Sequence, residues 1–181
     1  MTKVVFLDRD GTINEDLGYV TQPERLKFVP GSAKAVGDLK RAGFTVVVVT
    51  NQSAVGRGLA EPEGVHKTNQ ELSRLLSEAD SDAAIDFYAI SYDHPDHASD
   101  ERKPGIGLLR QVREKFEFNI EDCWMFGDKL SDVEFGLNAG IPSNQSLLVR
   151  TGYGEQTLAD AEGREIPNVK DLAEGVGLVL G

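Results

Sequence analysis

Short runs of apolar residues recur along the chain, and they are rich in β-branched and aromatic side chains. An unbroken apolar strand is buried on both faces, which is typical of a parallel sheet covered by helices. The pattern therefore predicts five buried strands. They lie at Val4–Leu7, Val46–Val49, Phe87–Ile90, Trp124–Phe126 and Leu147–Val149.

Amphipathic stretches separate these runs and predict helices, because their apolar residues recur at the spacing of one helix face. The strands and helices alternate, which predicts a doubly wound, Rossmann-like α/β fold: a three-layer sandwich around a parallel sheet. We expect a single domain, residues 1–181. The predicted helices lie at Gly31–Ala42, Val65–Ala79, Ile106–Phe116, Leu130–Ala139 and Val169–Leu180.

Two polar excursions interrupt the alternation, at Asn14–Pro30 and at Asp93–Lys103. Either segment can be a substrate-facing loop, and the second is equally well explained as a solvated surface loop. Both are too short for a separate lid. We therefore expect no large cap domain and an open site bordered by loops.

The charge balance limits the choice of partners. The chain has 19 basic and 30 acidic residues, a net charge of -11. Such a chain is repelled by nucleic acid, and it accepts a phosphorylated ligand only through a local basic pocket and a metal ion. Its one cysteine, Cys123, excludes an internal disulfide. The sequence shows no secretory signal, no membrane-spanning run and no coiled-coil seam, so we expect a cytoplasmic monomer without a membrane partner.

Candidate chemistry follows the predicted strands. Asp8 and Asp10 come after the first strand, Thr50 ends the second, Lys103 closes the loop after the third, and Asp128 follows the fourth. Ligands of open α/β sheets bind beyond the carboxyl ends of the strands, so these side chains should converge. Clustered carboxylates repel one another unless they share a cation, and hard oxygen ligands select Mg²⁺.

Each motif alone also has a simple structural explanation. The Asp-x-Asp-Gly-Thr run can be a turn, and Thr50 with Asn51 can cap a helix. Lys103 before a proline can be a solvated lysine at a helix start, and Asp128 can favour a helix dipole. Their joint occurrence, in this order and each after a buried strand, favours the functional interpretation.

These residues resemble the four signature motifs of the haloacid dehalogenase-like phosphatase superfamily, over nearly the whole chain. Within it, the chain resembles the D-glycero-D-manno-heptose 1,7-bisphosphate 7-phosphatases, with the histidinol-phosphate phosphatases as neighbours. The motifs are Asp8–Thr12, Thr50–Gln52, Lys103-Pro104 and Gly127–Asp132, with further likeness at Gly18–Val20, Arg57-Gly58, Arg102 and Val149–Gly152.

The resemblance implies a magnesium-dependent phosphatase that acts on a small phosphorylated metabolite through a phospho-aspartate. Asp8 would be the nucleophile and a metal ligand, and Asp10 the general acid and base, with its backbone carbonyl as a second ligand. Asp128 would be the third protein ligand, and Thr50 and Lys103 would hold the phosphoryl oxygens. The resemblance implies no role for Asp132. The implied substrate contacts are Asp16, Leu17, Gly18, Tyr19, Asn51, Gln52, Ser53, Arg57, Arg102 and Lys129.

Three of these contacts, Arg57, Arg102 and Lys129, are cations that could hold the second phosphate of a bisphosphate, although Arg57 is equally well explained as a surface residue. The resemblance departs at the zinc loop of the bisphosphatases, which uses three cysteines and a histidine. Those positions fall here on Ser91, Asp93, Ser99 and Glu101. Structural zinc needs thiolate or imidazole ligands, so we predict no zinc. The substrate stays open among heptose, histidinol and other small phosphates.

Two other classes of protein share some of these residues. A receiver-type switch domain also uses Asp, Thr and Lys on a doubly wound sheet, but its acceptor follows a middle strand. A catalytically inactive binding module would lack some of the required groups, and all are present here. Both are disfavoured.

Overall fold

A computed structural model describes residues 2–161 and 163–181. Its sheet has six strands in the order β3-β2-β1-β4-β5-β6, and every neighbouring pair is parallel. This confirms the predicted doubly wound α/β fold. The strands are β1 (Val4–Leu7), β2 (Thr45–Asn51), β3 (Phe87–Ser91), β4 (Trp124–Gly127), β5 (Ser146–Val149) and β6 (Asn168–Val169).

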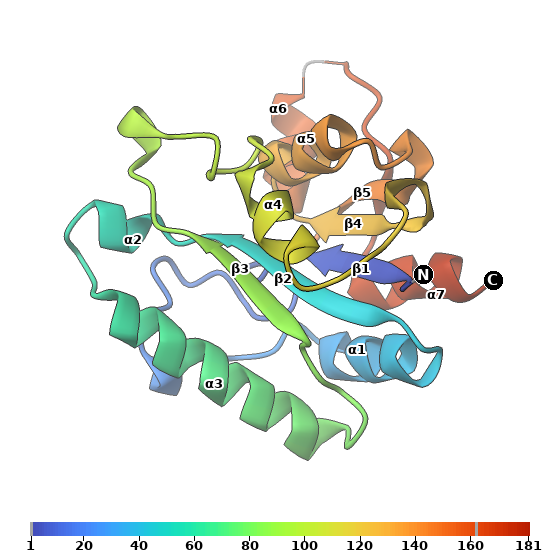
Figure 1. Ribbon diagram of the computed structural model, residues 1–181, viewed down its shortest axis with the longest axis horizontal. Helices are drawn as coiled ribbons and strands as arrows, with labels where there is room; N and C mark the ends of the chain where they lie inside the picture. The colour runs from blue at the N-terminus through green and yellow to red at the C-terminus, as the bar shows by residue number, and fades with distance from the viewer. Residues whose placement is uncertain (1, 162) are drawn as a thin grey trace.

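Helices cover both faces of the sheet (Figure 1). One face carries α1 (Ser32–Arg41), α3 (Pro62–Ala79) and α7 (Leu172–Leu180), and the other carries α4 (Gly107–Arg113), α5 (Leu130–Ala139) and α6 (Gly154–Asp160). A short α2 (Ser53–Gly56) follows β2. Single 3-10 turns lie at η1 (Pro23–Arg25), η2 (Pro95–His97), η3 (Ile120–Asp122) and η4 (Ser143–Gln145).

The core follows from the alternation of side chains along each strand. Val5 and Leu7 of β1 pack with α1, α3 and α7, whereas Val4 and Phe6 pack with α4 and α5. All four side chains are fully buried. Burial on both faces is why β1 and its neighbours read as continuous apolar runs.

The carboxyl end of the chain differs from the prediction. Val169 was placed at the start of a helix, but it belongs to β6, and the helix begins at Leu172. Asp171 caps that helix, because its Oδ1 accepts a hydrogen bond from Glu174 N at 2.9 Å. The sequence also did not predict α2 or α6, and α4 ends at Arg113 rather than at Phe116.

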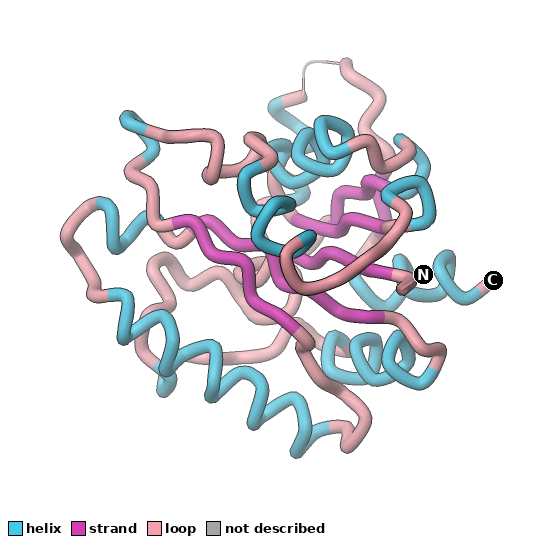
Figure 2. Tube along the Cα trace, viewed as in Figure 1, coloured by secondary structure: helices cyan, strands magenta, loops and turns pink. Residues whose placement is uncertain are grey.

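The strand order reverses beside β1, which lies between β2 and β4. The connections after β1 and β4 therefore diverge and leave a crevice at the carboxyl ends of the strands. The two long connections, residues 8–31 and 92–106, contain no helix longer than a 3-10 turn and no strand, and they lie on this side of the sheet, as the loops in Figure 2 show. Among the described helices, none has the length and apolar character that a bilayer crossing requires.

Candidate active site

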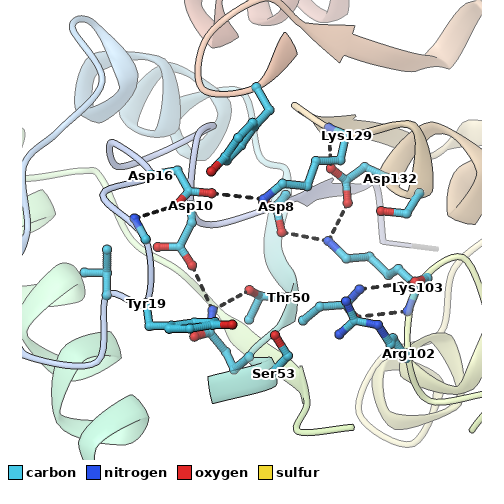
Figure 3. Close-up of a pocket in the computed structure, with 16 residues that line it drawn as sticks. Asp8, Asp10, Asp16, Tyr19, Thr50, Ser53, Arg102, Lys103, Lys129 and Asp132 are labelled. Atoms are coloured by element: carbon cyan, nitrogen blue, oxygen red, sulfur yellow. Dashed lines mark hydrogen bonds and ion pairs between the residues drawn. The ribbon is translucent and has the colours of Figure 1, made fainter. Parts of the chain in front are cut away.

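The strand ends converge on a pocket of about 320 Å³. Figure 3 shows side chains from the β1, β2, β3 and β4 connections directed into this one space. The pocket therefore joins the predicted motifs. It is lined by Asp8, Asp10, Asp16, Gly18, Tyr19, Val20, Thr50, Asn51, Gln52, Ser53, Arg102, Lys103, Lys129, Ser131, Asp132 and Tyr153.

Lys103 is the buried cation at the floor of the pocket. Its Nζ lies 2.7 Å from Asp8 Oδ1 and 2.7 Å from Asp132 Oδ1, and it donates to Val49 O at 2.6 Å. Burial opposes the charge on Lys103, but Asp132 and Asp8 outweigh it and raise the lysine pKa above its ordinary value. Burial raises the pKa of Asp8 to about 6, against the opposing effect of Lys103.

Asp128 is fully buried, and its carboxylate lies close to that of Asp8. Its Oδ2 accepts a hydrogen bond from the backbone N–H of Tyr153 at 2.8 Å, while no donor among the described residues reaches its Oδ1. Burial, and then the charge of Asp8, raise the pKa of Asp128 to about 8. Gly11 lies against this carboxylate, where a Cβ would overlap Oδ2.

Three carboxylates form a compact oxygen cluster. Asp8, Asp128 and Asp132 each offer one oxygen, and these oxygens lie within 4.8 Å of one another. A buried carboxylate oxygen without a donor is costly unless a cation neutralises it. The unpaired Oδ1 of Asp128 and the all-oxygen donor set therefore fit a Mg²⁺ ion.

The predicted metal set was Asp8, Asp10 and Asp128. Asp8 and Asp128 belong to the cluster, and Asp132, which had received no role, supplies the third carboxylate. The carboxylate of Asp10 points elsewhere. It accepts hydrogen bonds from Arg9 Nη2 at 2.8 Å, from Gln52 Nε2 at 2.8 Å and from Asn14 Nδ2 at 2.9 Å. Ligation by the backbone carbonyl of Asp10 stays a prediction.

The residues at the carboxyl end of β2 organise the neighbouring motifs. Asn51 pairs with the backbone of Lys103, because its Oδ1 accepts from Lys103 N at 3.0 Å and its Nδ2 donates to Lys103 O at 3.2 Å. Thr50 Oγ1 accepts from Gln52 Nε2 at 2.9 Å, which leaves the hydroxyl hydrogen of Thr50 free to donate. Ser53 begins α2 at the edge of the pocket.

Further cations border the entrance. Lys129 Nζ lies 3.0 Å from Asp16 Oδ2 and 4.7 Å from the centre of the Tyr153 ring. Burial opposes its charge, but Asp128, Asp8 and Asp16 raise the pKa of Lys129 above its ordinary value. Arg102 is half-buried, and burial together with the nearby positive charge of Arg57 lowers its pKa.

Two predicted contacts lie outside the pocket lining. Leu17 is 39% exposed, and Arg57 is also exposed. Their assignments stay predictions. Sequence reasoning missed Tyr153, although it follows a buried strand end at β5, which is the signal that identified the other motifs. Val20 and Ser131, which belong to the quoted motifs but received no role, also line the pocket.

Hydrogen bonds organise the loop that corresponds to the zinc loop. Asp93 Oδ2 accepts from both the backbone N and the Oγ of Ser99, each at 2.7 Å, and Glu101 N donates to Ser99 Oγ at 3.1 Å. Carboxylate and hydroxyl groups at these positions do not form the thiolate or imidazole set of a structural zinc site. That no zinc binds stays a prediction.

Comparisons with known proteins agree with this geometry. A family model described as HAD-hydrolase-like matches residues 101–175, and one described as polynucleotide kinase 3 phosphatase matches residues 3–132. The chain is 37% identical over 169 residues to the D-glycero-D-manno-heptose-1,7-bisphosphate 7-phosphatase of Chlorobaculum tepidum, covering 87% of this chain and 83% of the relative. It is 39% identical to the Pseudomonas putida D-glycero-beta-D-manno-heptose-1,7-bisphosphate 7-phosphatase, covering 86% of this chain and 87% of the relative.

A solved structure shares the fold. The D,D-heptose 1,7-bisphosphate phosphatase from B. bronchiseptica, complexed with magnesium and phosphate, has a TM-score of 0.89 and 30% identity, covering 99% of this chain and 98% of the other. The protein is thus a phosphatase of the haloacid dehalogenase-like class. Within that class, the chain belongs to the family of the D-glycero-D-manno-heptose-1,7-bisphosphate 7-phosphatases.

Proposed function

We propose that this phosphatase hydrolyses a phosphomonoester through a covalent phospho-aspartate on Asp8, with Mg²⁺ as cofactor. The observation that carries the proposal is the floor of the pocket. There the Asp8 carboxylate is held by Lys103 at 2.7 Å and stands beside the carboxylates of Asp128 and Asp132. Asp8, Asp128 and Asp132 would hold the cation, with the Asp10 carbonyl as a further ligand.

The chemistry of the chain's own residues follows from their positions. The free oxygen of Asp8 attacks the phosphorus, so that an Asp8–phosphorus bond forms as the bond to the leaving oxygen breaks. Lys103 and the hydroxyl of Thr50 donate hydrogen bonds to the phosphoryl oxygens, which carry the charge in the transition state. A bound Mg²⁺ would supply charge neutralisation at the same oxygens.

Asp10 completes both half-reactions. It gives a proton to the leaving alkoxide, and it then takes a proton from the water that attacks the phospho-aspartate. Phosphate and an alcohol are released, and Asp8 is regenerated as a carboxylate. Phosphate-monoester hydrolysis is so slow without a catalyst that these groups must lower the barrier by about 20 kcal/mol or more.

For the substrate we propose the 7-phosphate of D-glycero-D-manno-heptose 1,7-bisphosphate. The proposal is supported by relatives in several bacteria that are named for this activity. It is also supported by Arg102, which lines the pocket and whose pKa burial and the positive charge of Arg57 lower, because a second phosphate would offset this repulsion.

One observation favours a second candidate substrate. The loop of Ser91, Asp93, Ser99 and Glu101 borders Arg102 and has none of the cysteines that the resemblance implies for a zinc loop. A changed loop beside the entrance fits a changed substrate, such as histidinol phosphate or another small sugar phosphate.

A phosphate-release screen tests the proposal. The bisphosphate should give a kcat/KM at least about tenfold above that of histidinol phosphate or a simple sugar monophosphate, a difference of about 1.4 kcal/mol. Asp8→Asn should abolish turnover of every substrate. Retained activity in Asp8→Asn refutes the mechanism, whereas a preference for histidinol phosphate refutes only the heptose assignment.

A matched pair of variants tests the second anion site. Arg102→Ala should raise KM for the bisphosphate about tenfold or more and leave a monophosphate nearly unchanged. Arg74→Ala, which removes an exposed arginine on α3, is the control and should change neither. We further propose that the enzyme acts as a single-domain, cytoplasmic monomer, which sedimentation and cell fractionation test.

A further inference from the structure

Arg9 lies between the two acids of the first motif, and its side chain is fully buried. A buried guanidinium needs acceptors for its five N–H groups. Arg9 directs two of its three nitrogens at one neighbour: its Nε and Nη2 donate to Asp10 Oδ2 at 3.1 and 2.8 Å, and Nη2 also reaches Asp10 Oδ1 at 3.0 Å. Arg9 therefore fixes the orientation of the Asp10 carboxylate.

The guanidinium is itself held by helix α3. Its Nη1 donates to Asn69 Oδ1 at 2.9 Å, across 60 residues of sequence. Nη2 additionally donates to Val20 O at 2.7 Å and to Gln52 Oε1 at 3.2 Å. Asn69 is thus the acceptor that the structure gives to Nη1, and it anchors the end of Arg9 that does not contact Asp10.

Among the described residues, only the Oδ1 atom of the Asn69 side chain makes a hydrogen bond. Asn69 is only 4% exposed, and its Nδ2 finds no partner among the described residues. A buried amide nitrogen without an acceptor has a free-energy cost, which a nonpolar side chain at this position would not incur. The hydrogen bond that Asn69 Oδ1 accepts from Arg9 offsets this cost.

We propose that Asn69 is a positioning residue for the acid–base group Asp10. By accepting from Nη1, Asn69 sets the rotation of the Arg9 guanidinium, and Arg9 in turn aims the Asp10 carboxylate at the leaving oxygen. This inference rests on the proposed role of Asp10. Asn69 would thereby connect α3 to the acid–base step of Asp10, although no residue of α3 lines the pocket.

The effect of losing Asn69 Oδ1 should depend on the leaving group. Nη1 would then be buried without its acceptor, and the guanidinium would turn to find another, which misaligns Asp10. An alkoxide leaving group needs a proton from Asp10, whereas p-nitrophenolate leaves readily without one. Misalignment therefore slows the hydrolysis of alkyl phosphates more than that of aryl phosphates.

Asn69→Leu tests the inference. The measured quantity is the ratio of kcat/KM for glycerol phosphate to that for p-nitrophenyl phosphate, which covers steps up to phosphorylation of Asp8. Since a misplaced acid loses part of a contribution of about 10²–10⁴-fold, the ratio should fall about tenfold or more. Asn69→Asp keeps an acceptor oxygen and should restore the ratio to within about threefold of the original enzyme.

Two further variants keep the test decisive. Thr68→Val removes a buried hydroxyl from the adjacent position of α3, where Thr68 Oγ1 donates to Gly64 O at 2.9 Å, and it should leave the ratio unchanged. Asp10→Asn should itself lower the ratio. If the leucine variant does not fold, Asn69→Ala carries the same comparison.

The outcomes separate the two proposals. An Asp10→Asn variant that slows both substrates equally refutes the acid role of Asp10, and with it this inference. A selective loss in Asp10→Asn, combined with an equal loss or no loss in Asn69→Leu, overturns the inference about Asn69 alone.

Discussion

Lowering the pH should weaken magnesium binding to this enzyme, because two carboxyl groups of the proposed site gain protons near neutrality. Burial raises the pKa of Asp128 to about 8 and that of Asp8 to about 6, from an ordinary value of 3.8. Mg²⁺ binds carboxylates rather than carboxylic acids, so the ion must displace these protons.

The magnitude follows from the two pKa values. From about pH 8.5 to about pH 6.5, Asp128 changes from about one-quarter to almost fully protonated, and Asp8 from unprotonated to about one-quarter protonated. The apparent affinity for Mg²⁺ should therefore fall about thirtyfold over this range, or about 2 kcal/mol.

The metal-free protein should show the opposite trend in stability. A carboxyl group with a raised pKa binds more protons in the folded state than in the unfolded state, so the free energy of unfolding rises as the pH falls from about 8.5 towards 4. Each group contributes at most about 1.4 kcal/mol per pH unit. Added Mg²⁺ should consequently raise the melting temperature more at pH 8.5 than at pH 6.5.

Calorimetric titration with Mg²⁺ at several pH values, at constant ionic strength, measures the affinity directly. Asp128→Asn is the control, because it removes both the titrating group and a proposed ligand. An affinity that does not vary with pH, or that increases towards acid pH, would refute the assignment of Asp8 and Asp128 as metal ligands.

Other substitutions test the remaining contacts. Lys103→Met leaves Asp8 and Asp132 buried without their cation, so chemical denaturation should show a loss of about 3–5 kcal/mol, against less than about 0.5 kcal/mol for the exposed Lys34→Met. Its kcat should also fall by about a hundredfold or more. Gly11→Ala places a Cβ against Asp128 Oδ2 at a φ of 91°, so a metal titration should show much weaker Mg²⁺ binding. Gly43→Ala, at a φ of 81° in open space, should cost about 1 kcal/mol of stability and leave Mg²⁺ binding unchanged.

The central strands could be predicted from the sequence because both faces of β1, β2 and β4 are buried, which produces continuous apolar runs. The same reasoning could not find β6. It has two residues, of which Asn168 is exposed and only Val169 is buried, so it has no apolar run to detect. Pairing with β5 makes it a strand, and that is a tertiary contact.

The residues of the site likewise divide into those that the sequence predicts and those that depend on tertiary contacts. Asp8 and Asp128 could be found because each directly follows a buried strand, and Lys103 because it closes the loop after β3; the topology brings these strand ends together. Asp132 lies in the first turn of α5, and its two oxygens have different partners: Oδ2 accepts a hydrogen bond from the N–H of Lys129, and Oδ1 pairs with Lys103. Its sequence position suggests only the first of these contacts.

Tyr153 shows a further limit of side-chain patterns. It contacts Asp128 through its backbone N–H, a group that every residue except proline carries. Such contacts depend on where the chain passes after β5 and not on which side chain is present. Sequence reasoning identifies chemically distinctive side chains at strand ends, and it misses backbone donors.

The most direct test of the account is to trap the covalent intermediate. The enzyme is mixed with substrate and Mg²⁺, quenched during turnover and treated with borohydride, which reduces an aspartyl phosphate to homoserine. Peptide mass spectrometry should then find homoserine at position 8 and at no other aspartate. Turnover without this modification, or modification at Asp10 or Asp128 instead, would contradict the assignment of Asp8 as the nucleophile.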